Sequence, residues 1–228
     1  MAYRAALFDI GGPLDLEFAR ESAADSAIAM ACGLEGIRVD EAMIEAASEA
    51  AVEAFAANAY AHMIDTLCGG DPQTIGRVEA RVRAMLGNLD VFQLRPEIDA
   101  LLRRLRGRGV PLGIVANQSA AAREQLVRAG IGELFAYQGL SALTGFSKPD
   151  PRAFATAAEA LGVAAPACIM VGDRIDNDIV PAKALGMAAI RFKTGRHRRQ
   201  KPRSAAEAPD ANVTDVRELE EAILALLG

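Results

Sequence analysis

The stretch AALFDIGG, residues 5–12, runs from four apolar residues into an aspartate and then into a glycine-rich turn. Three later apolar runs resemble it: PLGIVAN (111–117), CIMVGD (168–173) and AAIRF (188–192). Continuous rather than alternating hydrophobicity is typical of parallel strands that are covered on both faces. Helical patterns separate the runs, as they do in right-handed βαβ units. The sequence therefore predicts an α/β fold with a doubly wound parallel sheet.

A segment without strand patterns follows the first run. Apolar residues recur at three- to four-residue spacing over 44–67 and 75–86, and Asp71 and Pro72 form a helix start signal for the second range. We expect an all-helical insertion whose apolar stripes form a packed core. The expected ranges are 16–93 for the helical domain and 1–15 with 94–228 for the Rossmann-like core domain.

Composition limits the partners of the chain. Its 25 Lys and Arg stand against 30 Asp and Glu, which gives no overall electrostatic reason to expect nucleic acid or an anionic membrane. No stretch approaches the roughly 18 apolar residues of a spanning helix, and the first apolar run is too short for a signal peptide. The three cysteines are far apart in sequence and suggest neither a disulfide framework nor a zinc site. We expect a cytoplasmic protein that acts on a small molecule.

One segment departs from this acidic balance. RFKTGRHRRQKPR, residues 191–203, carries seven Lys or Arg and no acid. A single short basic loop on an acidic protein is more often a solvated turn than a binding site for a polyanion. We therefore expect a solvated surface turn.

Polar residues follow the expected strands. Asp9 and Asp173 close two of the runs, Asn117 ends another, and Lys148 precedes a helix start in GFSKPDP. Asp178 lies in the loop after Asp173. Ligands of open parallel sheets bind beyond the carboxyl ends of the strands, so these side chains are expected at one edge. Taken singly, each has a structural alternative as a helix cap, a turn residue or a surface charge.

Grouped carboxylates point to a metal and a phosphorylated substrate. They repel one another unless a cation neutralises them, and Mg²⁺ prefers oxygen ligands while keeping waters and a phosphate in its shell. Lys148 beside Asp9 would hold phosphoryl oxygens while the Asp9 carboxylate attacks phosphorus. The pattern predicts phosphoryl transfer through an aspartyl-phosphate.

The segments LFDIGGPL, GIVANQ, SKPDP and VGDRIDND, in this order, resemble the four motifs of the haloacid dehalogenase superfamily over nearly the whole chain. The resemblance implies a Rossmann-like core, a helical cap inserted after the first motif, and an enzyme of the phosphatase-like branch. It also implies roles for five residues: Asp9 as nucleophile and metal ligand, Gly11 as a backbone carbonyl ligand of Mg²⁺, Lys148 as the phosphate lysine, Asp173 as a direct metal ligand, and Asp178 as support for the metal or its waters.

Two positions depart from the family pattern. Gly11 stands where a second aspartate usually acts as general acid and base, a contribution of about 10²–10⁴ in rate. Ala116 stands where a Ser or Thr hydroxyl usually contacts phosphate, and the amide of the following Asn117 can partly substitute. Asp15 and Glu17 are the nearest acids to Gly11, and we expect both to be solvated linker residues. The departures predict slow turnover or none.

Three functions remain open at this point. The leading one is a Mg²⁺-dependent phosphatase of a small phosphorylated metabolite. A catalytically impaired phosphate-binding or interaction protein is the alternative that the two departures favour. A 2-haloacid dehalogenase, in which Asp9 would displace halide, ranks lower because a carbon-centred substrate has no use for the acids around Asp173.

Overall fold

The computed structural model describes residues 3–87 and 89–228, so residues 1, 2 and 88 of the expected domain ranges lie outside the described residues. The chain divides into two compact units. The first, called the α/β unit here, consists of Met1–Leu16 and Gln93–Gly228. The second, called the helical unit, is Glu17–Phe92.

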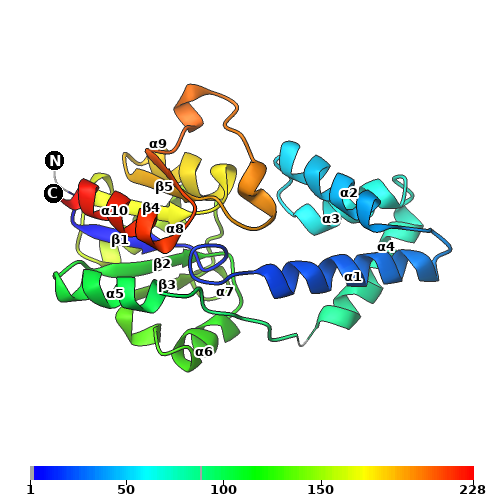
Figure 1. Ribbon diagram of the computed structural model, residues 1–228, viewed down its shortest axis with the longest axis horizontal. Helices are drawn as coiled ribbons and strands as arrows, with labels where there is room; N and C mark the ends of the chain where they lie inside the picture. The colour runs from blue at the N-terminus through cyan, green and yellow to red at the C-terminus, as the bar shows by residue number, and fades with distance from the viewer. Residues whose placement is uncertain (1–2, 88) are drawn as a thin grey trace. The chain divides into compact units, whose positions relative to one another are not determined.

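The α/β unit is built on one parallel sheet. Within the described residues it has six strands in the order β3-β2-β1-β4-β5-β6 (Figure 1). The strands are β1 Ala5–Phe8, β2 Leu112–Ala116, β3 Tyr137–Leu140, β4 Cys168–Gly172, β5 Ala188–Phe192 and β6 Ala211–Val213. From β1 the chain moves outward to β3, then returns to β4 on the other side of β1. This is the doubly wound α/β fold that the sequence predicts, and the strand order reverses at β1.

Helices cover the sheet. Ala5 and Leu7 of β1 belong to a buried cluster with Phe154 of α8 and Ala182 of α9. Because side chains alternate along a strand, Ala6 and Phe8, also fully buried, face the opposite side. The helices of this unit are α5 Ile98–Gly107, α6 Ala121–Arg128, α7 Ser141–Thr144, α8 Pro151–Ala160, α9 Val180–Ala184 and α10 Val216–Leu227.

The helical unit contains α1 Phe18–Leu34, α2 Glu41–Glu53, α3 Ala59–Leu67 and α4 Pro72–Leu86. Helix α1 packs with α4, and α2 packs with α3, around a buried cluster rich in alanine. As predicted, α4 begins at Pro72, where the Asp71 carboxylate accepts a hydrogen bond from Thr74 N at 2.9 Å. The apolar stripe over 44–67 spans two helices rather than one, because the chain turns between them with Phe55 at a φ of 53°.

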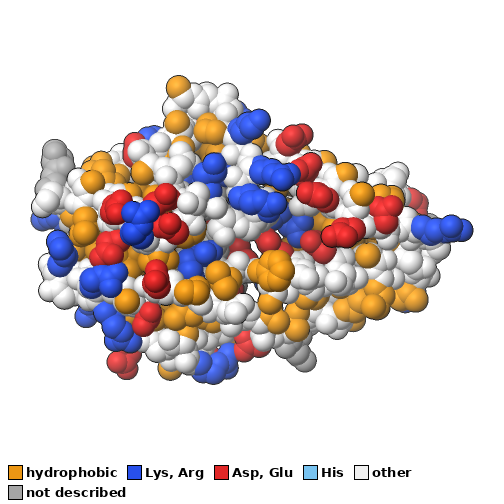
Figure 2. All heavy atoms as spheres, in the orientation of Figure 1, with side chains coloured by type: hydrophobic (Ala, Val, Ile, Leu, Met, Phe, Trp, Pro, Cys, Tyr) orange, Lys and Arg blue, Asp and Glu red, His pale blue; other side chains and the backbone are white. Residues whose placement is uncertain are grey.

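Some apolar side chains of the helical unit remain at its surface. Figure 2 shows such groups, and Phe18, Met30 and Leu34 of α1 are among the most exposed large ones. Helix α1 has 17 residues and is interrupted by charged side chains. None of the helices that the structure describes is long and apolar enough to span a bilayer.

The two chain segments that lead to the helical unit run side by side within the α/β unit. Leu16 N donates to Gln93 O at 2.9 Å, and Arg95 N donates to Leu14 O at 2.7 Å. The Asp15 carboxylate accepts a further hydrogen bond from Gln93 N at 2.9 Å and is buried. The expectation of a solvated linker acid is therefore wrong for Asp15, because its carboxylate joins the two segments.

Arg95 fastens the turn after β1 to the loop after β5. Its Nε and Nη2 donate to Gly12 O at 2.9 and 2.6 Å, and Nη2 also donates to Thr194 Oγ1 at 3.0 Å. The guanidinium lies 4.4 Å from the ring centroid of Phe192. Gly12 has a φ of 82°, and a Cβ there would lie 2.9 Å from Asp173 Cβ, so this approach requires glycine.

We expect Arg95→Met to lower the free energy of unfolding by about 1–3 kcal/mol, because Gly12 O loses both donors while the aliphatic stem is largely kept. The matched control is Arg103→Met, whose exposed side chain makes a 3.0 Å hydrogen bond to Gly130 O. Urea denaturation of both variants checks this. A loss for Arg95→Met no larger than that of the control would contradict the assigned role.

Candidate active site

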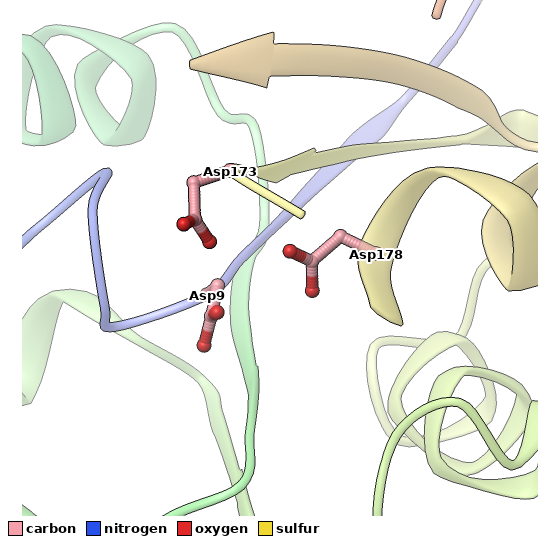
Figure 3. A group of neighbouring side chains, drawn as sticks. All are labelled: Asp9, Asp173 and Asp178. Atoms are coloured by element: carbon pink, nitrogen blue, oxygen red, sulfur yellow. The ribbon is translucent and has the colours of Figure 1, made fainter. Parts of the chain in front are cut away.

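Three carboxylates meet at the carboxyl edge of the two central strands. Asp9 follows β1 directly, Asp173 follows β4, and Asp178 lies in the π-helical turn Ile175–Ile179. One carboxylate oxygen from each lies within 4.8 Å of the others (Figure 3). Asp9 N donates to Val171 O at 2.9 Å, which carries the pairing of β1 and β4 up to the first of these acids. The strand order reverses here, where ligands of open α/β sheets bind.

Lys148 lies between two of these acids. Its Nζ is 2.8 Å from Asp9 Oδ2 and 2.6 Å from Asp178 Oδ1. The Lys148 side chain is 1% exposed, so both ion pairs are shielded from water. A buried ammonium needs such partners, since burying an unpaired charge is costly.

Asn117 holds the backbone of Lys148. Its Oδ1 accepts a hydrogen bond from Lys148 N at 2.7 Å, and its Nδ2 donates to Lys148 O at 2.8 Å. The amide that was expected to substitute for a phosphate-binding hydroxyl is thus engaged with both backbone groups of the lysine. Ala116, at the end of β2, is buried and offers only backbone groups to a ligand.

The charges of the site shift two pKa values. Burial raises the pKa of Asp9 to about 6; the nearby charge of Asp178 adds to this rise, and that of Lys148 opposes it. Burial alone would lower the pKa of Lys148, but the charges of Asp178 and Asp9 outweigh it and raise that pKa above the usual value. Lys148 therefore stays charged near neutral pH.

A glycine at the end of β4 makes room for Asp178. A Cβ on Gly172 would collide with the Cβ and Cγ of Asp178. Gly11, in the turn after β1, is also buried and forms a bridge with Asp15. Without a side chain, Gly11 can contribute to the site only through its backbone.

Two buried residues at the edge of this site were not predicted. Arg191 Nε donates to Asp173 O at 3.1 Å, and Gln200 Oε1 accepts from Ile175 N at 2.8 Å. Both are at most 4% exposed, so the expectation of a solvated turn over 191–203 is wrong at these positions. The available signal was an arginine inside the apolar run AAIRF, since a charge within a buried strand requires partners.

The donor set fits a small divalent cation. Asp9, Asp173 and Asp178 supply only oxygen atoms, and the one ammonium of Lys148 leaves an excess of negative charge. Hard cations such as Mg²⁺ take carboxylate and carbonyl oxygens and retain waters. The arrangement combines three carboxylates that could hold a metal with a fixed ammonium beside two of them.

Curated relatives match this chain over part of their length. The glyceraldehyde 3-phosphate phosphatase of Methanopyrus kandleri is 36% identical over 125 residues, 54% of this chain and 54% of that protein. The phosphoserine phosphatase of Thermus thermophilus is 34% identical over 152 residues, 66% of this chain and 58% of that protein. The chain thus spans little more than half the length of these relatives.

A solved structure and a family model match a longer part of this chain than the curated relatives do. The crystal structure of a predicted phosphoglycolate phosphatase from Haemophilus somnus superposes with a TM-score of 0.74 at 18% identity, covering 96% of this chain and 97% of that one. This match shows the fold. The model of the haloacid dehalogenase-like hydrolases matches residues 3–186, which include all the acids of the candidate site. The protein belongs to the haloacid dehalogenase-like hydrolases.

Proposed function

We propose that this protein is a Mg²⁺-dependent phosphatase that hydrolyses a small phosphorylated metabolite through an aspartyl-phosphate at Asp9. The observation that carries the proposal is the buried ammonium of Lys148 between Asp9 and Asp178, with Asp173 close enough to share a cation. The curated relatives are named for glyceraldehyde 3-phosphate and phosphoserine, which supports a small phosphate monoester as substrate.

Each residue has a role in the proposed reaction. Asp9, Asp173, Asp178 and the backbone carbonyl of Gly11 would hold Mg²⁺, which when bound offsets the negative charge of the phosphoryl oxygens. An Asp9 carboxylate oxygen bonds to phosphorus as the bond from phosphorus to the leaving oxygen breaks. Water then attacks phosphorus, releasing phosphate and restoring Asp9. Lys148 stabilises charge on the phosphoryl oxygens.

The phosphate would lie at the end of β2 as well. Ala116 and Asn117 would face it with backbone groups, while the Asn117 side chain keeps Lys148 in position.

We assign the helical unit the role of a cap that selects the substrate. The free thiols of Cys32, Cys68 and Cys168 fit an enzyme that works in the reducing cytoplasm.

Proton transfer is the weak point of the site. Gly11 cannot protonate a leaving oxygen or activate the hydrolytic water. Asp15, the nearest acid in the same turn, has Oδ1 engaged by Gln93 N. Hydrolysis of unactivated esters should therefore be slow relative to hydrolysis of acyl phosphates, whose leaving group needs little protonation.

We expect Asp9→Asn to lower phosphatase kcat/KM by about 10⁴-fold or more, because the attacking carboxylate is lost. Asp150→Asn is the matched control, since Asp150 is an N-cap of α8 that pairs with the exposed Arg152 and asparagine caps equally well. Steady-state assays with Mg²⁺ present give the comparison. Full activity of Asp9→Asn would exclude the mechanism.

We expect Asp173→Asn to weaken Mg²⁺ binding at least about tenfold, because charges 4 Å apart interact by about 4 kcal/mol at an effective dielectric constant of 20. Calorimetric titration with Mg²⁺ measures the dissociation constant, again with Asp150→Asn as control. If Asp173→Asn binds Mg²⁺ as tightly as the parent, the metal does not lie at this cluster.

We expect Gly11→Asp to raise kcat/KM for alkyl phosphate esters more than for acyl phosphates, with a gain of at most the ~10²–10⁴ of general acid–base catalysis. The backbone conformation that disfavours a side chain in this turn, a φ of 82°, is that of Gly12. The substitution is at Gly11 and leaves Gly12 unchanged. The measurement is the ratio of the two kcat/KM values in parent and variant, after a thermal melt confirms folding. An unchanged or reversed ratio would show that the missing acid does not limit this site.

A further inference from the structure

We propose that Gln200 and Arg191 are positioning residues that fix the loop carrying Asp173 and Asp178 in the geometry that binds the metal. This inference rests on the metal site of the proposed function. Arg191 and Gln200 belong to the basic segment 191–203. The proposal gives these two residues a role that does not depend on the positive charge of the segment.

The backbone after β4 is held at three successive residues. Asp173 O accepts from Arg191 Nε at 3.1 Å, Arg174 N donates to Asp178 Oδ2 at 2.9 Å, and Ile175 N donates to Gln200 Oε1 at 2.8 Å. The middle contact is made by a candidate ligand itself, and the outer two come from residues 191–200. The path of this loop therefore depends on groups outside it.

Gln200 joins this loop through both ends of its amide. While Oε1 binds Ile175 N, Nε2 donates to Asp176 Oδ1 at 3.1 Å. Asp176 is also paired with Arg174, whose Nη2 lies 2.6 Å from Asp176 Oδ2. The amide thus ties together a backbone N–H and a carboxylate that lie between the two proposed ligands in sequence.

Arg191 fixes Gln200 in turn. Its Nη1 donates to Gln200 O at 2.7 Å and its Nη2 to His197 O at 2.6 Å, while Gln200 N donates to the same His197 O at 2.9 Å. Arg191 is 3% exposed and lies in β5, where it pairs in register with Gly172. The buried guanidinium of Arg191 therefore holds both the loop that contains Gln200 and the backbone of Asp173.

The positions of the ligands follow from these contacts. Asp173 and Asp178 are five residues apart along an irregular turn, so a small change in the backbone between them would alter the separation of their carboxylates. Contacts that orient metal ligands typically change metal affinity about 10–100-fold when they are removed. The side chains of Gln200 and Arg191 act here through the loop and not on the substrate.

Gln200→Met tests the proposal, because methionine keeps the volume and the net charge while removing both amide contacts. We expect its Mg²⁺ dissociation constant to rise about tenfold. Because Ile175 N loses its acceptor, the melting temperature should also fall by a few degrees, while the variant stays folded at about 25 °C. Amide hydrogen exchange without Mg²⁺ should accelerate about 3- to 10-fold at Ile175. Gln138→Met is the matched control: it removes a hydrogen bond from Gln138 Nε2 to Gly132 O at 2.8 Å and should leave the Mg²⁺ dissociation constant unchanged.

A second variant tests the proposal at the other positioning residue, and it is the one to use if Gln200→Met does not fold. Arg191→Lys keeps the charge but cannot reproduce the guanidinium fork over three carbonyls, so it should also weaken Mg²⁺ binding. A dissociation constant for Gln200→Met within twofold of the parent overturns the proposal, even if exchange accelerates, because the contact would then be structural only. A parent that binds no Mg²⁺ contradicts the proposed function instead, and the exchange comparison then decides whether Gln200 holds the loop.

Discussion

The charged centre of this protein depends on one buried ammonium group. Lys148 Nζ lies within 2.8 Å of both Asp9 and Asp178, and its side chain is almost entirely shielded from water. Taking charges out of water costs several kcal/mol per ion, and removing one partner of such a pair typically costs about 3–5 kcal/mol. The ammonium therefore offsets the repulsion between Asp9 and Asp178, and the elements around these acids are arranged to keep the lysine in place.

The surrounding structure restricts where the charged groups can move. The amide of Asn117 binds both backbone groups of Lys148, so the lysine is fixed at its main chain as well as at its tip. Gly12 and Gly172 leave space that a Cβ would fill beside Asp173 and Asp178. Close approach of the backbone on one side and polar contacts on the other leave the carboxylates little freedom, as the proposed metal site requires.

Much of the fold and part of the site follow from local sequence patterns. The inner strands are predictable because burial on both faces leaves continuous apolar runs, whereas the edge strands β3 and β6, YQGL and ANV, are short, contain polar residues and carry no such signal. Parallel strands bring their carboxyl ends to one edge, which is why Asp9 and Asp173 could be predicted to lie close together. The contacts of Asn117 and Gln200 join residues 31 and 25 positions apart and depend on side-chain geometry that no local pattern encodes.

The side-by-side entry and exit of the helical unit have a consequence for how such a chain can diversify. Residues 14–16 and 93–95 are hydrogen-bonded neighbours, so the 76 residues of Glu17–Phe92 occupy the place of a single loop in the α/β unit. Closing a longer loop costs only about 0.6 kcal/mol for each doubling of its length. Insertions of different size and sequence can therefore be exchanged at this point with little effect on the sheet or on the acids at its edge.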